Sequence, residues 1–362
     1  MLWGKRLDMI VREGDPFNAE SPRSALAQGP LTEIEAFYVR SHGPVPDIDP
    51  AAWRLTVDGL VEQPTTFTLA ELRDQFSEHD VVATLQCAGN RRAGLMAVRD
   101  IPGELPWGPG ATSTARWTGA RLCDVLAAAG ADPQADHVAF EAPDVSRTAS
   151  PPQSFGSSIP LAKARREEVL LAWAMNGVPL PAVHGGPVRV VVPGYIGARS
   201  VKWVNRISVR HEPSDNYYQA LDYRLLPADA DLDRARPGEG LSLGQLGLNS
   251  AILSPDDGAT VPPGPTTVTG YALAGDDRGV ARVDVSCDAD SSWRQAQLEA
   301  QLSPWSWRLW SIEVHLSPGH HQISARAWDT AAALQPEREA HLWNPRGYVN
   351  YAWAVVHLTV AG

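Results

Sequence analysis

The feature that most constrains the fold is a change of pattern near Asn249. Beyond it the sequence consists of short runs in which apolar and polar residues alternate with a period of two. The runs cover residues 282–287, 305–309, 312–316 and 323–327. Pro-Pro-Gly and Pro-Gly turn signals separate them, and this combination is typical of strands with one buried face. The C-terminal part, roughly 100 residues long, is therefore predicted to be an all-β sandwich of immunoglobulin-like size.

The first 210 residues instead mix helix and strand signals. Val81–Leu85 is a short apolar run that suits a buried strand, and Val188–Val192 is another, ended by a Pro-Gly pair. Between them, Leu122–Ala129 carries apolar residues at helical spacing, with Thr118 as its predicted cap and Gly130 as its stop. This part is predicted to be α+β.

A stretch rich in Asp, Gly and Leu, residues 227–247, has no clear periodicity and is predicted to link the two parts. We therefore expect an α+β domain over residues 1–230, a linker over 231–248 and an all-β domain over 249–362. Two domains agree with the length of 362 residues, since a domain typically has ~150.

The charge composition limits the classes of partner that we expect for this chain. The chain has 31 basic and 42 acidic residues, for a net charge of −11. This acidic balance argues against DNA or anionic lipid as the main partner. No apolar run approaches the ~18 residues that span a membrane. An anionic substrate would need a local basic pocket that opposes the field of the whole chain.

The cysteines and the N-terminus predict a reducing compartment. Cys87, Cys123 and Cys287 are too far apart for zinc or haem motifs, and their odd number disfavours a disulfide framework. The first residues reach charged positions before any stretch long enough for a signal-peptide core. We expect a cytoplasmic protein.

The most informative segment is Thr84–Arg92, with the sequence TLQCAGNRR. Cys87 stands at the end of a predicted buried strand, where ligands commonly meet α/β sheets, and the following Ala-Gly permits close approach of a ligand. Nearby arginines favour the thiolate, which is the form that ligates metals. The alternative is a buried structural cysteine beside a surface turn, because buried free cysteines are common.

TLQCAGNRR resembles the signature of the sulfite oxidase family of molybdopterin oxidoreductases. The resemblance continues through further blocks in the order found in the family, and the N-terminal block is similar to that of the plant-type, haem-free enzymes. These blocks cover residues 13–20, 37–44, 114–122, 158–161, 184–189, 197–203 and 343–347. Such an ordered series over about 340 residues makes a chance similarity very improbable.

The resemblance implies a molybdenum-molybdopterin cofactor, with no haem or flavin. Cys87 matches the cysteine that ligates the molybdenum, and soft sulfur suits such a centre. The positions that match cofactor-binding residues of the family are Tyr38, Val39, Arg40, His42, Cys87, Asp144, His184, Arg189, Ser200, Val201 and Lys202. Cys123 and Cys287 lack the motif and are expected in the core.

The resemblance also implies a pocket for a small anion. Arg40, Arg92 and Arg346 match the arginines that line this pocket in the family, with Trp107 and Tyr223 beside them. A lone arginine more often forms a surface ion pair, but three in matched motifs favour a binding role. Three departures from the family are Ser41 for a common asparagine, Arg224 for a lysine and Pro345 for an apolar residue.

The activity implied is oxidation of sulfite to sulfate by oxygen-atom transfer. A nitrate reductase, or another reductase of oxyanions or S-oxides with the same fold, is the nearest alternative. Two features argue against a nitrate reductase. Arg346 stands at a position where nitrate-type enzymes tend to have another residue, and this sequence has no haem or flavin domain. The alternative from another class is a cofactor-free dimeric scaffold, in which the pocket arginines would have no reason to remain together.

The second domain resembles the family's immunoglobulin-like dimerisation module, which implies a homodimer. Arg346 lies within this domain and is expected to reach back to the active site. The electron acceptor stays open between oxygen and a separate cytochrome.

Overall fold

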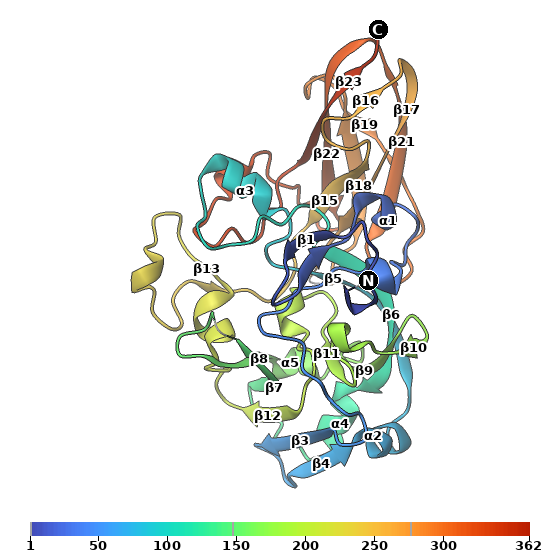
Figure 1. Ribbon diagram of the computed structural model, residues 1–362. Coiled ribbons are helices and arrows are strands. Elements are labelled where there is room, and N and C mark those ends of the chain that lie inside the picture. Colours follow the sequence, from blue (N-terminus) through green and yellow to red (C-terminus); the bar gives the residue numbers. More distant parts are fainter. Residues whose placement is uncertain (1, 147, 276) are drawn as a thin grey trace.

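The computed structural model describes residues 2–146, 148–275 and 277–362. The molecule is elongated, with a β-rich sandwich that ends in the C-terminus projecting from a larger mixed part (Figure 1). Helices and strands alternate along the first part, and strands dominate the second. The predicted combination of an α+β part and an all-β sandwich is confirmed.

Two sheets form the first part. One has the order β10 (Val178–Pro179), β9 (Leu170–Met175), β6 (Thr112–Arg121), β5 (His79–Gln86), and β11 (Arg189–Val191) also pairs with β9. The other has the order β4 (Thr65–Thr68), β3 (Arg54–Gly59), β12 (Arg206–Arg210), β7 (His137–Ser146), β8 (Gln153–Pro160). The predicted strands at 81–85 and 188–192 are β5 and β11.

Short helices and hairpins connect these strands. The helices are α1 (Arg23–Leu26), α2 (Leu69–Gln75), α3 (Arg92–Val98), α4 (Leu122–Ala128) and α5 (Leu161–Ala164). The N-terminal hairpin consists of β1 (Ile10–Glu13) and β2 (Asn18–Glu20), and β13 (Arg224–Leu225) pairs with β14 (Leu241–Ser242) within the region predicted to be a linker.

The sandwich has two sheets. One has the order β15 (Asn249–Ser254), β17 (Gly264–Leu273), β21 (Arg308–Leu316), β20 (Gln297–Leu298). The other has the order β16 (Thr260–Val261), β23 (Ala354–Val360), β22 (Gly319–Asp329), β18 (Val280–Ser286), β19 (Arg294–Gln295). The alternating residues of β18 and β22 place one apolar set between the sheets, as the period of two predicted.

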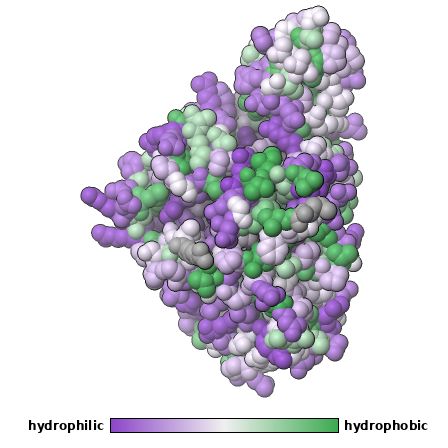
Figure 2. Space-filling model, viewed as in Figure 1, coloured by the Kyte–Doolittle hydropathy of each residue, from purple (hydrophilic) through white to green (hydrophobic). Residues whose placement is uncertain are grey.

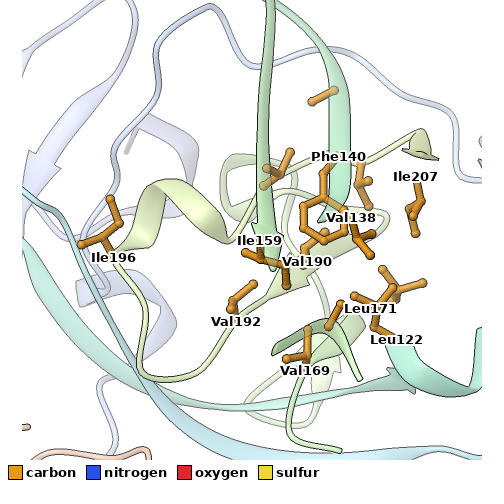
Figure 3. Close-up of a cluster of buried hydrophobic side chains, with 14 of the residues drawn as sticks. Leu122, Val138, Phe140, Ile159, Val169, Leu171, Val190, Val192, Ile196 and Ile207 are labelled. Atoms are coloured by element: carbon orange, nitrogen blue, oxygen red, sulfur yellow. The ribbon is translucent and has the colours of Figure 1, made fainter. Parts of the chain in front are cut away.

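The core of the first part lies where its two sheets and α4 meet. Figure 3 shows side chains from α4 and from β7, β8, β9, β11 and β12 converging on this core. Those labelled are fully buried, namely Leu122, Val138, Phe140, Ile159, Val169, Leu171, Val190, Val192, Ile196 and Ile207. Burying each such side chain contributes ~1.5–3 kcal/mol, so this core holds the strand ends that carry the site in place.

The end of β5 is joined to the sandwich by buried polar contacts. Arg91 has a left-handed backbone conformation with φ of 64°, and its guanidinium is buried. It donates to Asn249 Oδ1 at 3.1 Å and to the carbonyl oxygens of Ala352 at 2.7 Å and Trp353 at 2.8 Å. The two parts therefore meet directly behind the Cys87 turn.

Three local expectations were wrong. Thr118 does not cap a helix, because it lies in β6 and donates a hydrogen bond to Asp80 Oδ1 on β5, while α4 begins only at Leu122. Cys123 and Cys287 are half-buried rather than in the core, although Cys287 packs against the core of the sandwich. The run 305–309 is not a separate strand, since β21 begins at Arg308 and Trp307 instead donates its indole hydrogen to the carbonyl oxygen of Pro30.

The face seen in Figure 2 is mostly hydrophilic, with hydrophobic residues gathered in a patch near its middle. Within the described ranges, the chain contains no helix with the length and apolar character needed to cross a lipid bilayer.

Candidate active site

A deep pocket opens at the end of β5, between the loop at 37–42 and the segment 183–203. It holds about 640 Å³ of space, part of it open to solvent. The predicted site residues that line it are Tyr38, Val39, Arg40, His42, Cys87, Asp144, His184, Arg189, Ser200, Lys202 and Tyr223. Residues distant in the sequence are thus brought together, as a cofactor site requires.

Cys87 lies directly after β5, and its side chain is 6% exposed. Its carbonyl oxygen accepts from the Asn90 backbone N–H in a tight turn, and the Gly89 N–H lies 3.4 Å from Sγ. Burial raises the pKa of the thiol, although Arg40 and Arg92 act to lower it. The expected effect of the arginines is present, but burial outweighs it, so a bound metal would itself have to drive deprotonation.

Several cationic groups surround the inner end of the pocket. Arg189 is buried and donates to the carbonyl oxygens of His184 at 2.9 Å and Ser200 at 2.8 Å. Burial lowers the pKa of Arg189 to about 10. Lys202 donates to Ser41 Oγ at 2.7 Å, and burial holds its pKa well below the ordinary value. Ser41, the departure from the common asparagine, thus accepts a hydrogen bond from a pocket lysine.

Asp144 is the acidic residue among the groups that line this pocket. Its Oδ1 is buried and has no hydrogen-bond partner in the described part of the chain. Burial raises the pKa of Asp144 to about 7, against the lowering effect of Lys202. An unpaired buried oxygen of this kind is costly, and a donor on a bound group would satisfy it.

Lys5 is a contact that sequence reasoning missed. It is 3% exposed and lies behind His184, with Nζ 2.5 Å from His184 Nε2 and 2.9 Å from the carbonyl oxygen of Phe37. Burial lowers the pKa of Lys5 to about 7, and burial, followed by Lys5, lowers that of His184 further. The one signal available in the sequence was that lysine is rare in this chain, which contains only three.

Tyr223 lies at the pocket wall beside His42, whose Nε2 is 2.7 Å from the tyrosine hydroxyl. Burial raises the pKa of Tyr223 well above its ordinary value and lowers that of His42. Both groups are therefore neutral near pH 7, and the pair can share one hydrogen bond while offering another to a ligand.

The predicted anion-pocket residues divide into two groups. Arg40 lines the pocket, and burial is outweighed by Tyr223, Cys87 and Glu104, so that its pKa is raised. Arg92 and Arg346 lie behind it and do not line the cavity. Their nearest carboxylates are Glu104, 2.9 Å from Arg92, and Asp222, 3.2 Å from Arg346.

Arg346 contacts Glu104 and Asp222 of the first part of the chain but does not line the cavity. Trp107 and Val201 do not line the cavity, because both are buried in the protein core. Trp107 belongs to the same buried hydrophobic cluster as Phe37 and Leu85, which line the pocket.

Two glycines make room for the Arg92 side chain. A Cβ at Gly89 would lie 2.7 Å from the guanidinium carbon of Arg92, and one at Gly347 would lie 2.7 Å from its Cγ. Gly347 also has φ of 61°, which disfavours any other residue. The CAGNRR and WNPRG blocks thus meet across the domain boundary at this arginine.

Comparisons with known proteins identify the family. A molybdopterin-binding domain of oxidoreductases matches residues 42–218, and a dimerisation domain of molybdenum-cofactor oxidoreductases matches residues 242–361. Sulfite oxidase of Arabidopsis thaliana is 36% identical, over 95% of this chain and 92% of that enzyme. The chain belongs to the sulfite oxidase family.

Other members of the wider family are also similar. Mitochondrial sulfite oxidase of Mus musculus is 44% identical over 95% of this chain, which spans 64% of that enzyme's length. Nitrate reductase [NAD(P)H] of Hordeum vulgare is 38% identical over 99% of this chain and 43% of its own. The crystal structure of the sulfane dehydrogenase SoxCD from Paracoccus pantotrophus has a TM-score of 0.81, with 26% identity over 99% of this chain and 90% of that chain.

The pocket fits the cofactor of the sulfite oxidase family. The described residues contain no group of three or more His, Cys, Asp and Glu that could hold a metal ion. Cys87 offers one soft ligand, Arg189 and Lys202 offer charge for a phosphate, and Asp144 offers an unpaired acceptor. This donor set suits a metal that arrives with its own organic ligand.

Proposed function

We propose that the protein oxidises sulfite to sulfate at a molybdenum centre ligated by Cys87. The observation that carries the proposal is that Cys87, Arg40 and Tyr223 line one pocket with the cofactor-binding set. The reaction adds one oxygen atom from water to sulfite and releases two electrons and two protons. When bound, the molybdenum cofactor supplies the oxygen-atom and two-electron transfer, and the protein supplies binding and electrostatics.

The protein residues have distinct roles in this proposal. Arg40 attracts the anion and holds it beside Cys87, because its charge is buried and its partners, Ser41 O and Asn18 Oδ1, are neutral. Tyr223, neutral and oriented by His42, donates a hydrogen bond to an oxygen of the bound oxyanion. Arg92 and Arg346, which do not line the cavity, are assigned to contact the oxyanion once it is bound.

The cofactor phosphate is assigned to Arg189, His184 and Lys202, and the cofactor's donors to Asp144. The loop residues Tyr38, Val39, Ser200 and Val201 complete the proposed binding set. Val201 is buried and does not line the cavity, so its place in this set rests on the resemblance alone.

One test is metal analysis followed by turnover. Protein produced in a host that makes the cofactor should contain about one molybdenum atom per chain and reduce ferricyanide when sulfite is added. Absence of molybdenum would contradict the enzyme proposal and favour the cofactor-free scaffold. Molybdenum without sulfite turnover would contradict the substrate alone.

Reduction of nitrate is the second candidate, because the barley nitrate reductase is about as similar as the Arabidopsis sulfite oxidase. Arg346 favours sulfite over nitrate as the substrate, because nitrate-type enzymes tend to have another residue at this position. The same preparation, supplied with reduced viologen and nitrate, would separate the two: rapid nitrate reduction with slow sulfite oxidation would reverse the assignment.

Lys202 provides a direct test of cofactor binding. Replacing Lys202 by Met should lower the pterin retained per folded protein about tenfold, equal to ~1.4 kcal/mol, since a charge-assisted hydrogen bond is lost. Pterin is measured by fluorescence after release and oxidation. Lys163→Met, which removes a lysine paired with Glu168, is the control and should retain wild-type pterin. Full retention in the Lys202 variant would remove it from the phosphate site.

We also propose a homodimer formed through the sandwich, on the basis of the dimerisation-domain match at 242–361. The sandwich is proposed to be immunoglobulin-like, and the domain boundaries to be 1–230 and 249–362.

A cytoplasmic, reducing location is supported by the three free cysteines. Oxygen or a separate cytochrome accepts the electrons, and comparing the two as oxidants would decide between them.

A further inference from the structure

Glu104 is an acidic side chain in the midst of the proposed substrate arginines. Its Oε2 lies 2.9 Å from Arg92 Nη1, and its Oε1 lies 3.8 Å from Arg346 Nη1. The Glu104 side chain is 17% exposed, and that of Arg92 is 3% exposed. The Glu104 carboxylate thus lies between two of the arginines that match the family's anion pocket.

The charge count shows what Glu104 does to the pocket. Arg40, Arg92 and Arg346 contribute +3, and Glu104 and Asp222 contribute −2, which leaves +1. The hydrogen bonds of Arg40 go to neutral oxygens, whereas the other two arginines face carboxylates. Glu104 and Asp222 therefore neutralise part of the positive charge that would otherwise attract an oxyanion.

Glu104 is one of several groups that contact Arg92. Arg92 also donates to the carbonyl oxygens of Leu105 at 3.1 Å and Gly347 at 3.2 Å, and its guanidinium lies 5.1 Å from the ring centroid of Tyr348. None of these three contacts involves a carboxylate. Glu104 therefore adds negative charge to an arginine that is already anchored.

A comparison with Glu20 supports this reading. Glu20 is buried as well, but it accepts from the backbone N–H groups of Gly108 at 2.6 Å and Gly110 at 3.2 Å and pairs with Arg12. Such a carboxylate is satisfied as a structural group. Burial raises the pKa of Glu104, with Arg92 opposing, so that its charge is held at a cost.

Arg346 gives an independent indication that a ligand belongs here. Its Nε is buried and has no hydrogen-bond partner among the described residues, although Nη1 contacts both Glu104 and Asp222. An unpaired N–H on a buried guanidinium is costly, and an oxyanion is the partner that suits it.

We propose that Glu104 is an internal competitor for the oxyanion: its carboxylate engages Arg92 and Arg346 when the pocket is empty and is displaced from them when the anion binds. It thereby weakens oxyanion affinity and promotes release of the product. For sulfite and sulfate as the ligands this rests on the proposed function, whereas competition for an oxyanion rests on the arginines alone.

The test is a Glu104→Gln variant, which keeps the shape and removes the charge. Sulfate is the probe, and its dissociation constant is measured on the purified holoprotein by isothermal calorimetry at fixed ionic strength. We expect about tenfold tighter sulfate binding and a lower KM for sulfite, since one unit charge is removed from a site of low effective dielectric. Glu313→Gln makes the same change of net charge on the exposed face of β21 and should leave sulfate affinity unchanged.

Unchanged or weaker sulfate binding in Glu104→Gln would overturn the proposal, since it would show that Glu104 only positions the arginines. If that variant fails to fold, Glu104→Ala is measured with the same two expectations. Tighter sulfate binding without any sulfite oxidation would contradict the proposed function and support the role of Glu104 as a competitor. Sulfite oxidation with unchanged sulfate affinity would support the proposed function and contradict the role of Glu104 as a competitor.

Discussion

Replacing Cys87 by Ser should reduce sulfite turnover by more than about 100-fold, since loss of groups that merely orient a metal ligand already costs ~10–100-fold. Serine fits the buried site after β5 with little change of shape, so the fold should persist. Its oxygen is a hard donor and remains protonated where burial already disfavours the thiolate. Molybdenum content and ferricyanide reduction are measured on the same preparation.

The matched control for this prediction is Cys123→Ser. Cys123 is a half-buried thiol on α4, outside the residues that line the pocket, so the same chemical change there should leave turnover within about twofold of wild type. Full activity of the Cys87 variant would exclude Cys87 as the metal ligand. Equal losses in both variants would point to a general effect on folding.

Replacing Arg91 by Met should lower the free energy of unfolding by about 3–5 kcal/mol, because several buried carbonyl oxygens lose their donor together. The guanidinium bonds Asn249, Ala352 and Trp353 across the domain boundary, and a methionine side chain offers none of these hydrogen bonds. The shift of the urea unfolding midpoint at constant slope measures the loss.

Arg294→Met is the control for this effect. Arg294 is an exposed residue of β19, and a surface substitution of this kind typically changes stability by no more than about 0.5 kcal/mol. A loss in the Arg91 variant as small as in this control would show that the contacts across the boundary are energetically minor.

Local pattern predicted much of the fold. The strands at 81–85, 188–192 and 323–327 were predictable because apolar β-branched or alternating residues report burial directly. Thr118 misled, because a hydroxyl suits both a helix cap and a cross-strand hydrogen bond to Asp80, and strand pairing decided between them. Val201 lies in a matched block and Trp107 in the loop after α3, yet neither of them lines the cavity.

The parts of the site that could not be predicted depend on contacts between distant segments. Lys5 meets His184 across 179 residues, and Glu104 meets Arg346 from the other domain. Neither carries a local signal, because an isolated Lys or Glu reads as a solvated surface residue. The balance of charge in the pocket was likewise invisible, since it depends on which carboxylates approach the arginines.

Arg91 and Arg92 are neighbours in the sequence but serve different parts of the molecule. The left-handed backbone at Arg91 sends its side chain into the sandwich, while Arg92 packs against Gly347 beside the pocket. Exchange of the sandwich for that of a relative would therefore be a change to the active site as well. A chimaera should work only if the donor domain supplies matching carbonyls at 352–353 and a glycine at 347, which makes these positions the junction to preserve in recombination.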